Sequence, residues 1–400
     1  MIDNAPVNRS SQEPYVTSFE SQVRSIDGRA LTLEETYFYA EGGGQPADRG
    51  TVAGIDVVDV QKRDGVTVHT LAEEPDIGAG DTVEGSVDES FRTYSMRAHT
   101  ASHVIYGAGR KLLDSHGYGG FDIGEDSIRM DFATSASDDD LNPLTFQRMA
   151  NEVVWDGLSV DWYGMGIERA RDDDRIVFNL GDDVDTTDTV RIVEVGDWDI
   201  SACGGTHVRN TAEIGPIKVL GVSNPGADLV RVEYAVGPAA INRQIDETRN
   251  ATRAAKTLDT SVDDLARRAE QLLEEKQSLQ AELDELGEEL LDARLAALAE
   301  DTQTRDGDEW LVGTVNAVGP NTVADRIGEL GDDTADVVVL VGTDGSTFIV
   351  VGTGGETDAN AVIDDVTGEF GGGGGGRPTL AQGGGLDANP DSVVEYLRRD

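Results

Sequence analysis

The alternation of apolar and polar positions divides the chain into four segments of different character. Residues 15 to about 90 are rich in β-branched and aromatic residues, which is typical of strands. Asp27-Gly28 lies between two such runs and indicates a hairpin turn. The pattern predicts strands over residues 15–26, 30–33, 51–60 and 66–71, with a glycine-rich stretch at 41–50 among them.

The second segment, residues 91 to 240, mixes helical and strand periodicities. Apolar spacing predicts helices over residues 95–113 and 142–154. Short β-rich runs predict strands over residues 127–132, 189–195, 217–223 and 229–235. This combination is typical of an α+β domain.

The third segment, residues 241 to about 300, predicts a long helix with a coiled-coil-like face. Its leucines repeat every seven residues with no proline among them: Leu265, Leu272, Leu279 and Leu286, with Leu283 and Leu290 on the adjoining seam. Lys276 also lies on the seam. Both an intramolecular helical hairpin and a homodimer stalk therefore remain open.

The last segment, from about residue 305, returns to an α/β pattern. Strands predicted over 336–342 and 347–352 flank a hairpin signal, Thr343-Asp-Gly-Ser. Helices are predicted over 321–330, 360–367 and 391–398, and a glycine run at 371–376 lies between the last two.

Charge changes this picture more than any other feature of the composition. The 400 residues carry a net charge of −45, with five lysines against 27 arginines. Such a charge destabilises a compact state unless salt screens it, and the Debye length falls to about 3 Å at 1 M salt. Because the acidic residues are spread along the chain, we interpret the composition as halophilic, an adaptation to a salt-rich cytoplasm.

Three further observations concern the compartment of the protein. A single cysteine excludes a disulfide framework. No apolar run has the 18 or more residues of a membrane span, and the polar N-terminus lacks a signal core. We therefore expect a soluble, cytoplasmic protein with no membrane partner.

Candidate metal chemistry is concentrated in two short motifs, His99-Thr-Ala-Ser-His103 and Cys203-Gly-Gly-Thr-His207. They use the sole cysteine and three of the five histidines. On a helix, His99 and His103 share one face, so both imidazoles can bind one ion. A thiolate with three imidazoles favours zinc over magnesium or calcium, which predicts one Zn²⁺ per chain. The other histidines, His69 and His116, are assigned no role.

The role of that zinc stays open at this level. Four protein ligands describe a closed structural site, whereas catalytic zinc keeps a position open. A catalytic ion can lower the pKa of a bound water to about 7, or it can hold the substrate while another water attacks.

Four motifs together identify a family resemblance. The segment from Thr36 to Gly50, Thr-Tyr-Phe-Tyr-Ala-Glu-Gly-Gly-Gly-Gln-Pro-Ala-Asp-Arg-Gly, and the two metal motifs resemble the editing domain of alanyl-tRNA synthetase. The second metal motif continues as the run from Val208 to Val219, which also resembles that domain. The fourth motif, Gly376-Arg-Pro-Thr-Leu-Ala-Gln-Gly-Gly-Gly385, resembles the C-terminal tRNA-binding domain of that family. No aminoacylation part precedes these motifs, so the chain is similar to the freestanding AlaX-type editing proteins in their long form.

This resemblance implies an α+β multidomain fold. We expect a small N-terminal β-barrel domain over residues 1–90, carrying the glycine-rich motif, and a zinc-dependent editing domain over 91–240. A helical, coiled-coil-like linker over 241–304 and a DHHA1-like, α/β tRNA-binding domain over 305–400 would follow.

The implied activity is hydrolysis of Ser-tRNA(Ala), and of Gly-tRNA(Ala) as well, by a zinc-dependent aminoacyl-tRNA hydrolase acting in trans. A site built for alanine discriminates poorly against serine or glycine, so a second site that removes the wrong ester is needed. By resemblance, Thr36 senses the serine hydroxyl, Gln45 lines the pocket near the ester, and Gly43 and Gly44 let the terminal adenosine approach the backbone. The alternatives are an ordinary strand threonine, and a tight turn or bulge for Gln45 and its glycines.

At the C-terminal end, the resemblance implies that Arg377 and Gln382 contact tRNA(Ala), against the alternative of a flexible glycine loop. Where the family often carries a lysine, this chain has Gly373, which removes one phosphate contact. Two other functions remain as alternatives: a noncatalytic tRNA-binding module with structural zinc, and threonyl-type editing. A homodimer could form through the helical or C-terminal region.

Overall fold

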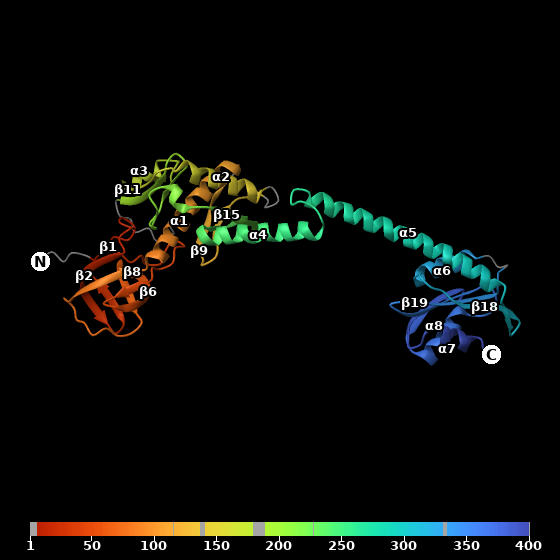
Figure 1. Ribbon diagram of the computed structural model, residues 1–400. Coiled ribbons are helices and arrows are strands. Elements are labelled where there is room, and N and C mark those ends of the chain that lie inside the picture. Colours follow the sequence, from red (N-terminus) through yellow and green to blue (C-terminus); the bar gives the residue numbers. More distant parts are fainter. Residues whose placement is uncertain are drawn as a thin grey trace. The chain divides into compact units, whose positions relative to one another are not determined.

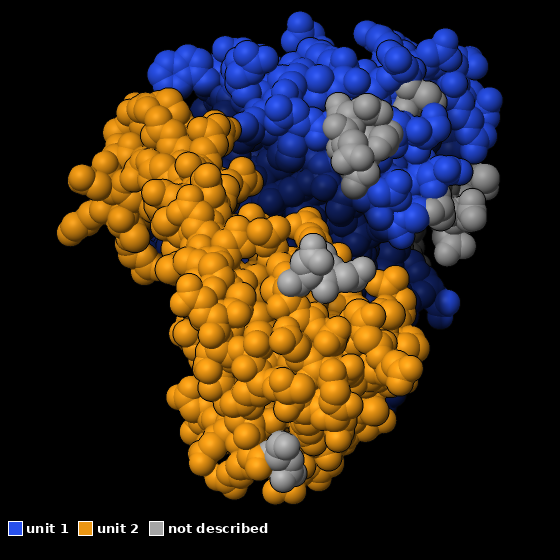
Figure 2. Space-filling view, turned by 90° about the vertical axis from the view of Figure 1, so that its right-hand side faces the viewer, with its two compact units in different colours: residues 1–251 blue, residues 252–400 orange. Residues whose placement is uncertain are grey.

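The computed structural model describes residues 6–114, 116–136, 141–178, 189–226, 228–330 and 334–399. The chain forms two compact units, residues 1–251 and 252–400 (Figures 1 and 2). The fold is a mixed α/β multidomain architecture that contains a six-stranded barrel, as predicted. The four-part division by role stays a prediction.

The first unit begins with the barrel, drawn at the red end of the chain in Figure 1. Its strands close in the order β2 (Ser18–Asp27), β3 (Ala30–Leu33), β7 (Val66–Leu71), β6 (Ile55–Arg63), β5 (Gly50–Val52) and β8 (Thr82–Val87). Inward positions alternate along each strand and fill the interior with Val, Leu and Phe side chains. A short strand, β1 (Val7–Asn8), pairs in parallel with β4 (Glu35–Thr36) beside the barrel.

The single strand predicted over residues 51–60 is wrong. The structure has two strands there, β5 and β6, which pair as a hairpin. Ala53 and Gly54 form the turn with φ values of +51° and +79°. A left-handed alanine is uncommon, so the apolar pattern alone did not reveal this turn.

The rest of the first unit is built around α1 (Glu89–Leu112), which is buried along most of its length. The helix begins six residues earlier than predicted because the Asp88 side chain caps it by accepting a hydrogen bond from the Phe91 N–H. Further helices described in this unit are α2 (Pro143–Asp156), α3 (Ile167–Arg171) and a 3-10 turn at Thr211–Ile214. The helix α4 (Gly237–Thr257) begins in this unit and runs past its last residue, Ala251.

Two four-stranded sheets flank this helix. One has the order β15 (Ile217–Gly226), β16 (Leu229–Val236), β10 (Ile128–Ala133) and β9 (Gly117–Ile123). The other has the order β11 (Val160–Gly166), β13 (Thr189–Val195), β14 (Asp199–Ala202) and β12 (Val177–Phe178). The strands predicted in this segment are all present: β13 has its predicted bounds, and the bounds of the other three differ by at most three residues.

A buried ion pair joins the barrel to α1. Arg92 is 1% exposed, and its Nε donates to both carboxylate oxygens of Asp48 at 3.1 Å. Its Nη1 also donates to the Pro14 carbonyl at 2.8 Å. A buried guanidinium is tolerated when its donors are satisfied in this way. The pair fixes the segment that follows the glycine-rich turn against the helix that carries two of the candidate metal ligands.

The second unit contains α5 (Leu265–Ala299) and one six-stranded sheet, drawn at the blue end of the chain (Figure 1). The sheet order is β17 (Gln303–Arg305), β18 (Asp308–Thr314), β19 (Val337–Asp344), β20 (Ser346–Thr353), β22 (Leu380–Leu386) and β21 (Gly373–Arg377). The remaining helices are α6 (Pro320–Glu329), α7 (Ala359–Phe370) and α8 (Pro390–Leu397).

One continuous helix from residue 241 to about 300 is not present. Asp259 adopts a left-handed φ of +50° just after α4 ends, and α5 begins at Leu265. The C-terminal end of α5 packs into the second unit through Leu291, Leu295 and Leu298. The seam leucines nearer its middle are exposed: Leu279, Leu283, Leu286 and Leu290. Pairing of this seam in a dimer stays a prediction.

Most of the glycine run, residues 373–376, lies in a paired strand, which differs from the loop alternative. Residues 373–377 form β21, the edge strand, paired with β22. A Cβ on Gly374 would lie 2.4 Å from the Gln382 carbonyl oxygen, so glycine is required for this close approach. None of the helices in the described part of the chain is long and apolar enough to cross a membrane.

Candidate metal centre

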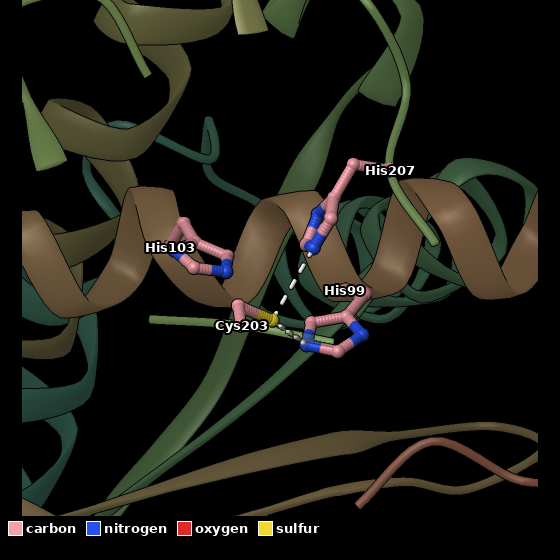
Figure 3. A group of neighbouring side chains, drawn as sticks. All are labelled: His99, His103, Cys203 and His207. Atoms are coloured by element: carbon pink, nitrogen blue, oxygen red, sulfur yellow. Dashed lines mark hydrogen bonds between the residues drawn. The ribbon is translucent and has the colours of Figure 1, made fainter. Parts of the chain in front are cut away.

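The four predicted ligands come together in one buried cluster (Figure 3). His99 and His103 project from successive turns of α1, and Cys203 and His207 lie in the loop that follows β14. One ligand atom from each residue lies within 4.8 Å of those of the other three. Segments about one hundred residues apart in the sequence therefore present three nitrogens and one sulfur to a common centre.

The spacing of these atoms suits a tetrahedral ion. The Sγ of Cys203 lies 3.4 Å from the Nε2 of His99 and 3.4 Å from the Nε2 of His207. Donors bound to one zinc at about 2.1 to 2.3 Å are separated by roughly 3.6 Å at the tetrahedral angle. The residues therefore fit a metal of zinc's size and softness.

Hydrogen bonds orient each imidazole so that Nε2 faces the centre. The Nδ1 of His99 contacts the Gln45 Oε1 at 2.8 Å, and the Nδ1 of His103 contacts the Asp199 Oδ2 at 2.7 Å. Both oxygens are acceptors, so the ring protons lie on Nδ1 and the Nε2 atoms are free to bind a metal.

A hydrogen bond to the Thr100 hydroxyl orients the imidazole of His207 in the same way. Its Nδ1 lies 3.2 Å from the Thr100 Oγ1. Thr100 donates its own proton to the Met96 carbonyl at 2.8 Å, so its oxygen accepts from the ring. All three imidazoles therefore carry the partner on Nδ1 that metal-binding histidines ordinarily have.

The electrostatics of the cluster favour a thiolate. Burial opposes the charged form, but the surrounding imidazoles of His99 and His207 lower the pKa of Cys203 well below its usual value. Burial lowers the pKa of His207 well below its usual value, so this ring is neutral. Burial opposes the charged form of His103, but its hydrogen bonds to Asp199 and Cys203 raise its pKa to about 10. Metal binding requires a thiolate with neutral imidazoles, so a metal would displace one proton from His103.

Glycine at position 205 is needed for the loop to pass over His99. A Cβ there would lie 2.1 Å from the His99 Cε1 and 2.2 Å from its Nδ1. A Cβ on Gly204 would meet nothing within 4 Å. The two glycines of the motif are therefore not equivalent, and only Gly205 determines how closely the two half-sites approach.

A cavity of about 420 Å³ adjoins the cluster, which is within the usual size range of small-ligand sites. Its wall includes His99 and Cys203 from the cluster, and Thr36 and Gly43 from the N-terminal motif. The lining also includes Tyr118, Phe121, Met130 and residues of the N-terminal segment 6–11. The cavity thus joins the barrel, the glycine-rich turn and the metal cluster.

Two predicted substrate-side residues lie behind the cavity wall. Gln45 is 1% exposed, and besides His99 it bonds Thr206, whose N–H donates to Oε1 at 3.0 Å. Gly44 has φ of +81°, and a Cβ there would lie 2.1 Å from the Phe121 carbonyl oxygen. Gly42 and Gln45 form an antiparallel bridge, so Gly43 and Gly44 between them form a tight turn, which was one of the two alternatives for these glycines.

Three polar residues that contact functional side chains carried no signal in the sequence. Asp199 and Thr100 orient metal ligands, and His69 contacts Thr36 through its Nε2 at 2.8 Å. Asp199 lies four residues before Cys203, but this spacing has no meaning without the pairing of β13 and β14. His116 is exposed and lies outside the cluster.

The predicted tRNA-contacting residues lie in the second unit. Arg377 ends β21, and Gln382 lies on β22 opposite Gly375. Both side chains are exposed. They come from paired neighbouring strands, and their role stays a prediction.

Comparisons with known proteins agree with the motifs. Residues 190–233, which include Cys203 and His207, match the model of the threonyl and alanyl tRNA synthetase second additional domain. Residues 11–91 match the model of class II (A) tRNA synthetases. The alanine–tRNA ligase of Methanosarcina barkeri is 34% identical over 97% of this chain. The resemblance to alanyl-tRNA synthetases is confirmed.

Other relatives extend this similarity. The alanine–tRNA ligases of Halorubrum lacusprofundi and Pyrococcus abyssi are 36% and 31% identical, over 96% of the chain in both cases. The chain spans 43% of the length of the Methanosarcina and Halorubrum enzymes and 42% of the Pyrococcus enzyme. The crystal structure of the C-Ala domain from Aquifex aeolicus alanyl-tRNA synthetase is 28% identical, with a TM-score of 0.21, and covers 24% of this chain and 93% of that domain.

Proposed function

We propose that this chain is an editing hydrolase that removes serine, and also glycine, from mischarged tRNA(Ala) supplied in trans. In the reaction, water adds to the ester carbonyl and the bond to the terminal ribose oxygen breaks, which yields the free amino acid and intact tRNA. The observation that carries this proposal is the cavity of about 420 Å³ whose wall joins Thr36 to the His99 and Cys203 side of the metal cluster.

We propose zinc as the metal, held by His99, His103, Cys203 and His207. The three imidazoles and one thiolate match the ligand preference of zinc, and each imidazole has its second nitrogen occupied by a partner. When bound, the ion supplies positive charge that stabilises the oxyanion that develops during ester hydrolysis.

The chain's own residues supply selectivity and position. Thr36 presents a hydroxyl at the cavity wall, where a serine side chain would form a hydrogen bond that an alanine side chain does not form. Glycine is smaller and enters without this bond. Gln45 acts as a positioning residue, since it holds both His99 and the Thr206 backbone at the cluster.

Binding of tRNA by so acidic a chain must use more than charge. In molar salt, counterion release contributes little to affinity, so shape and local arginines carry more of it. We propose that Arg377 and Gln382, exposed on the paired strands β21 and β22, contact the tRNA. Affinity that falls only gently between moderate and molar KCl would support this account, and a steep loss would contradict it.

The deciding experiment measures deacylation of Ser-, Gly- and Ala-tRNA(Ala) by the purified chain in molar KCl. We expect the serine ester to be cleaved about 100-fold or more faster than the alanine ester. A chelator should abolish the activity and added Zn²⁺ should restore it. Cys203→Ala should be inactive, whereas His116→Ala, an exposed histidine outside the cluster, should retain activity. Hydrolysis that is unaffected by metal removal would overturn the zinc proposal.

A noncatalytic tRNA-binding module with structural zinc is the second candidate. It is favoured by one observation: all four ligands are buried protein side chains, which is the composition of a closed structural site. Such a module would bind tRNA without turnover in the same assay. Threonyl-type editing is tested by including Ser-tRNA(Thr), which the proposed enzyme should leave intact.

A further inference from the structure

His69 is a buried polar side chain in a barrel interior filled mainly by Val, Leu and Phe side chains. It lies on β7 at an inward position, between Thr67 and Leu71, and is 0% exposed. Its ring packs edge-on against Phe38 with centroids 5.4 Å apart. An apolar side chain of similar volume would fill this position without the desolvation cost of an imidazole. The hydrogen bonds of His69 show what the imidazole does there.

The tautomer of His69 follows from its two partners. Its Nδ1 lies 3.2 Å from the Leu31 carbonyl oxygen, which can only accept, so the ring proton is on Nδ1. Burial lowers the pKa of His69 to about 4, so the ring is neutral near neutral pH. The Nε2 is therefore an acceptor without a proton, and its partner is the Thr36 hydroxyl at 2.8 Å.

This arrangement uses the only proton of the Thr36 hydroxyl. Thr36 must donate to the His69 Nε2, and its Oγ1 also accepts from the Phe38 N–H at 3.2 Å. One lone pair of the oxygen remains without a partner among these contacts, and Thr36, which is 2% exposed, lines the cavity. Thr36 can therefore accept a hydrogen bond from a ligand but cannot donate one.

We infer that His69 is a positioning residue that sets the hydrogen-bond direction of Thr36, so that the cavity selects ligands with a hydroxyl donor at this point. The inference rests on the proposed function for the identity of the ligand, a seryl ester. It adds a determinant of specificity from inside the barrel, because His69 does not line the cavity and acts through Thr36, which does. Without His69, the Thr36 hydroxyl rotates and offers its proton to the cavity. The preference of this point in the cavity for a hydroxyl donor over water or a methyl group is then smaller.

Three substitutions at position 69 separate hydrogen bonding from packing. His69→Phe keeps a planar side chain but removes both bonds. His69→Asn can keep the bond to the Leu31 carbonyl but cannot reach Thr36. His69→Gln can place an amide oxygen near the Nε2 position, where it accepts from Thr36. Leu71→Ala is the matched control, because it truncates a buried inward side chain of the same strand that cannot form a hydrogen bond with Thr36.

The readout is the ratio of serine-ester to glycine-ester deacylation, since glycine does not use the Thr36 contact. We expect this ratio to fall about tenfold in His69→Phe and His69→Asn and to recover in His69→Gln. Leu71→Ala should lower stability and leave the ratio unchanged. An unchanged ratio in His69→Phe, or equal loss in the glutamine variant, would overturn the inference.

Two measurements keep this test separate from the proposed function. Nitrogen NMR of isotopically labelled histidine reports directly which ring nitrogen of His69 carries the proton. A proton on Nε2 would overturn the inference without any measurement of activity. Calorimetry with amide-linked seryl- and alanyl-adenosine analogues, which are not hydrolysed as esters, reports selectivity in binding. A wild-type chain that cleaves no ester would overturn the proposed function, while a seryl preference that survives in His69→Phe would overturn the inference alone.

Discussion

The Nδ1 of His103 donates a hydrogen bond to the Oδ2 of Asp199 across 2.7 Å, inside a region where both side chains are at most 3% exposed. Asp199 also accepts from the Ser201 hydroxyl at 2.8 Å, which fixes the carboxylate. Asp199 therefore orients the ligand His103. It does so from β14, the strand that directly precedes the ligands Cys203 and His207.

Asp199→Asn should weaken metal binding by about 10- to 100-fold, the usual effect of losing a carboxylate partner of a ligating histidine. The amide is a poorer acceptor, and the ring loses both its orientation and part of its basicity. Affinity is measured by competition with a zinc-chelating dye. Asp197→Asn, an exposed carboxylate two residues earlier, is the control, and an equal loss in both variants would contradict the positioning role.

Gly205→Ala should displace His99, because the added Cβ would lie 2.1 Å from its Cε1. Overpacking of this kind costs about 1 to 3 kcal/mol of stability, and we expect metal affinity and deacylation to fall with it. Gly204→Ala, where the Cβ meets nothing within 4 Å, is the matched control. If the two alanine variants bind zinc equally well, the close approach of the loop to His99 is not what positions the site.

His69 predicts a specific pH dependence of stability. Its pKa is about 4 in the folded chain, below its unfolded value of 6.5, so the unfolded state takes up a proton that the folded state excludes. Stability from this group is therefore complete above pH 6.5 and is lost as the pH falls to about 4, by a total of about 3 kcal/mol.

The measurement for His69 is urea unfolding of wild type and His69→Gln between pH 7 and pH 4 in constant molar salt. The metal cluster and the surface carboxylates are common to both proteins, so their titration cancels in the difference. We expect wild type to lose stability relative to the variant over this range. Parallel curves would show that burial does not lower the pKa of His69 in the folded chain.

Gly373→Lys should strengthen tRNA binding. A Cβ at this position on the edge strand meets nothing within 4 Å, so the longer side chain is accommodated. One added phosphate contact should increase affinity by about two- to tenfold and steepen the salt dependence by about one unit of slope. Gly373→Ala tests for effects on the strand alone, and equal affinity of the lysine and alanine variants would exclude a phosphate near this strand.

Much of the secondary structure follows from local patterns. The strands β7 and β13 lie at their predicted bounds and α1 ends within one residue of its predicted end, because each has a clear apolar period, whereas the start of α1 lies six residues before the predicted one. The turn at Ala53 and the break at Asp259 were missed, since both depend on non-glycine residues with positive φ. Such conformations are stabilised by contacts that lie outside the local sequence.

The sequence by itself determined which atoms can form the candidate centre. Chemical type and spacing along one helix already paired His99 with His103, and the sole cysteine, with its neighbour four residues on, completed the set. Only the folded chain decided what holds those atoms in place. Gln45, Asp199 and Thr100 reach the three imidazoles from other segments, and His69 reaches Thr36 from inside the barrel. The direction of each hydrogen bond depends on the distance between segments that are far apart along the chain. A local sequence pattern contains no information on such distances.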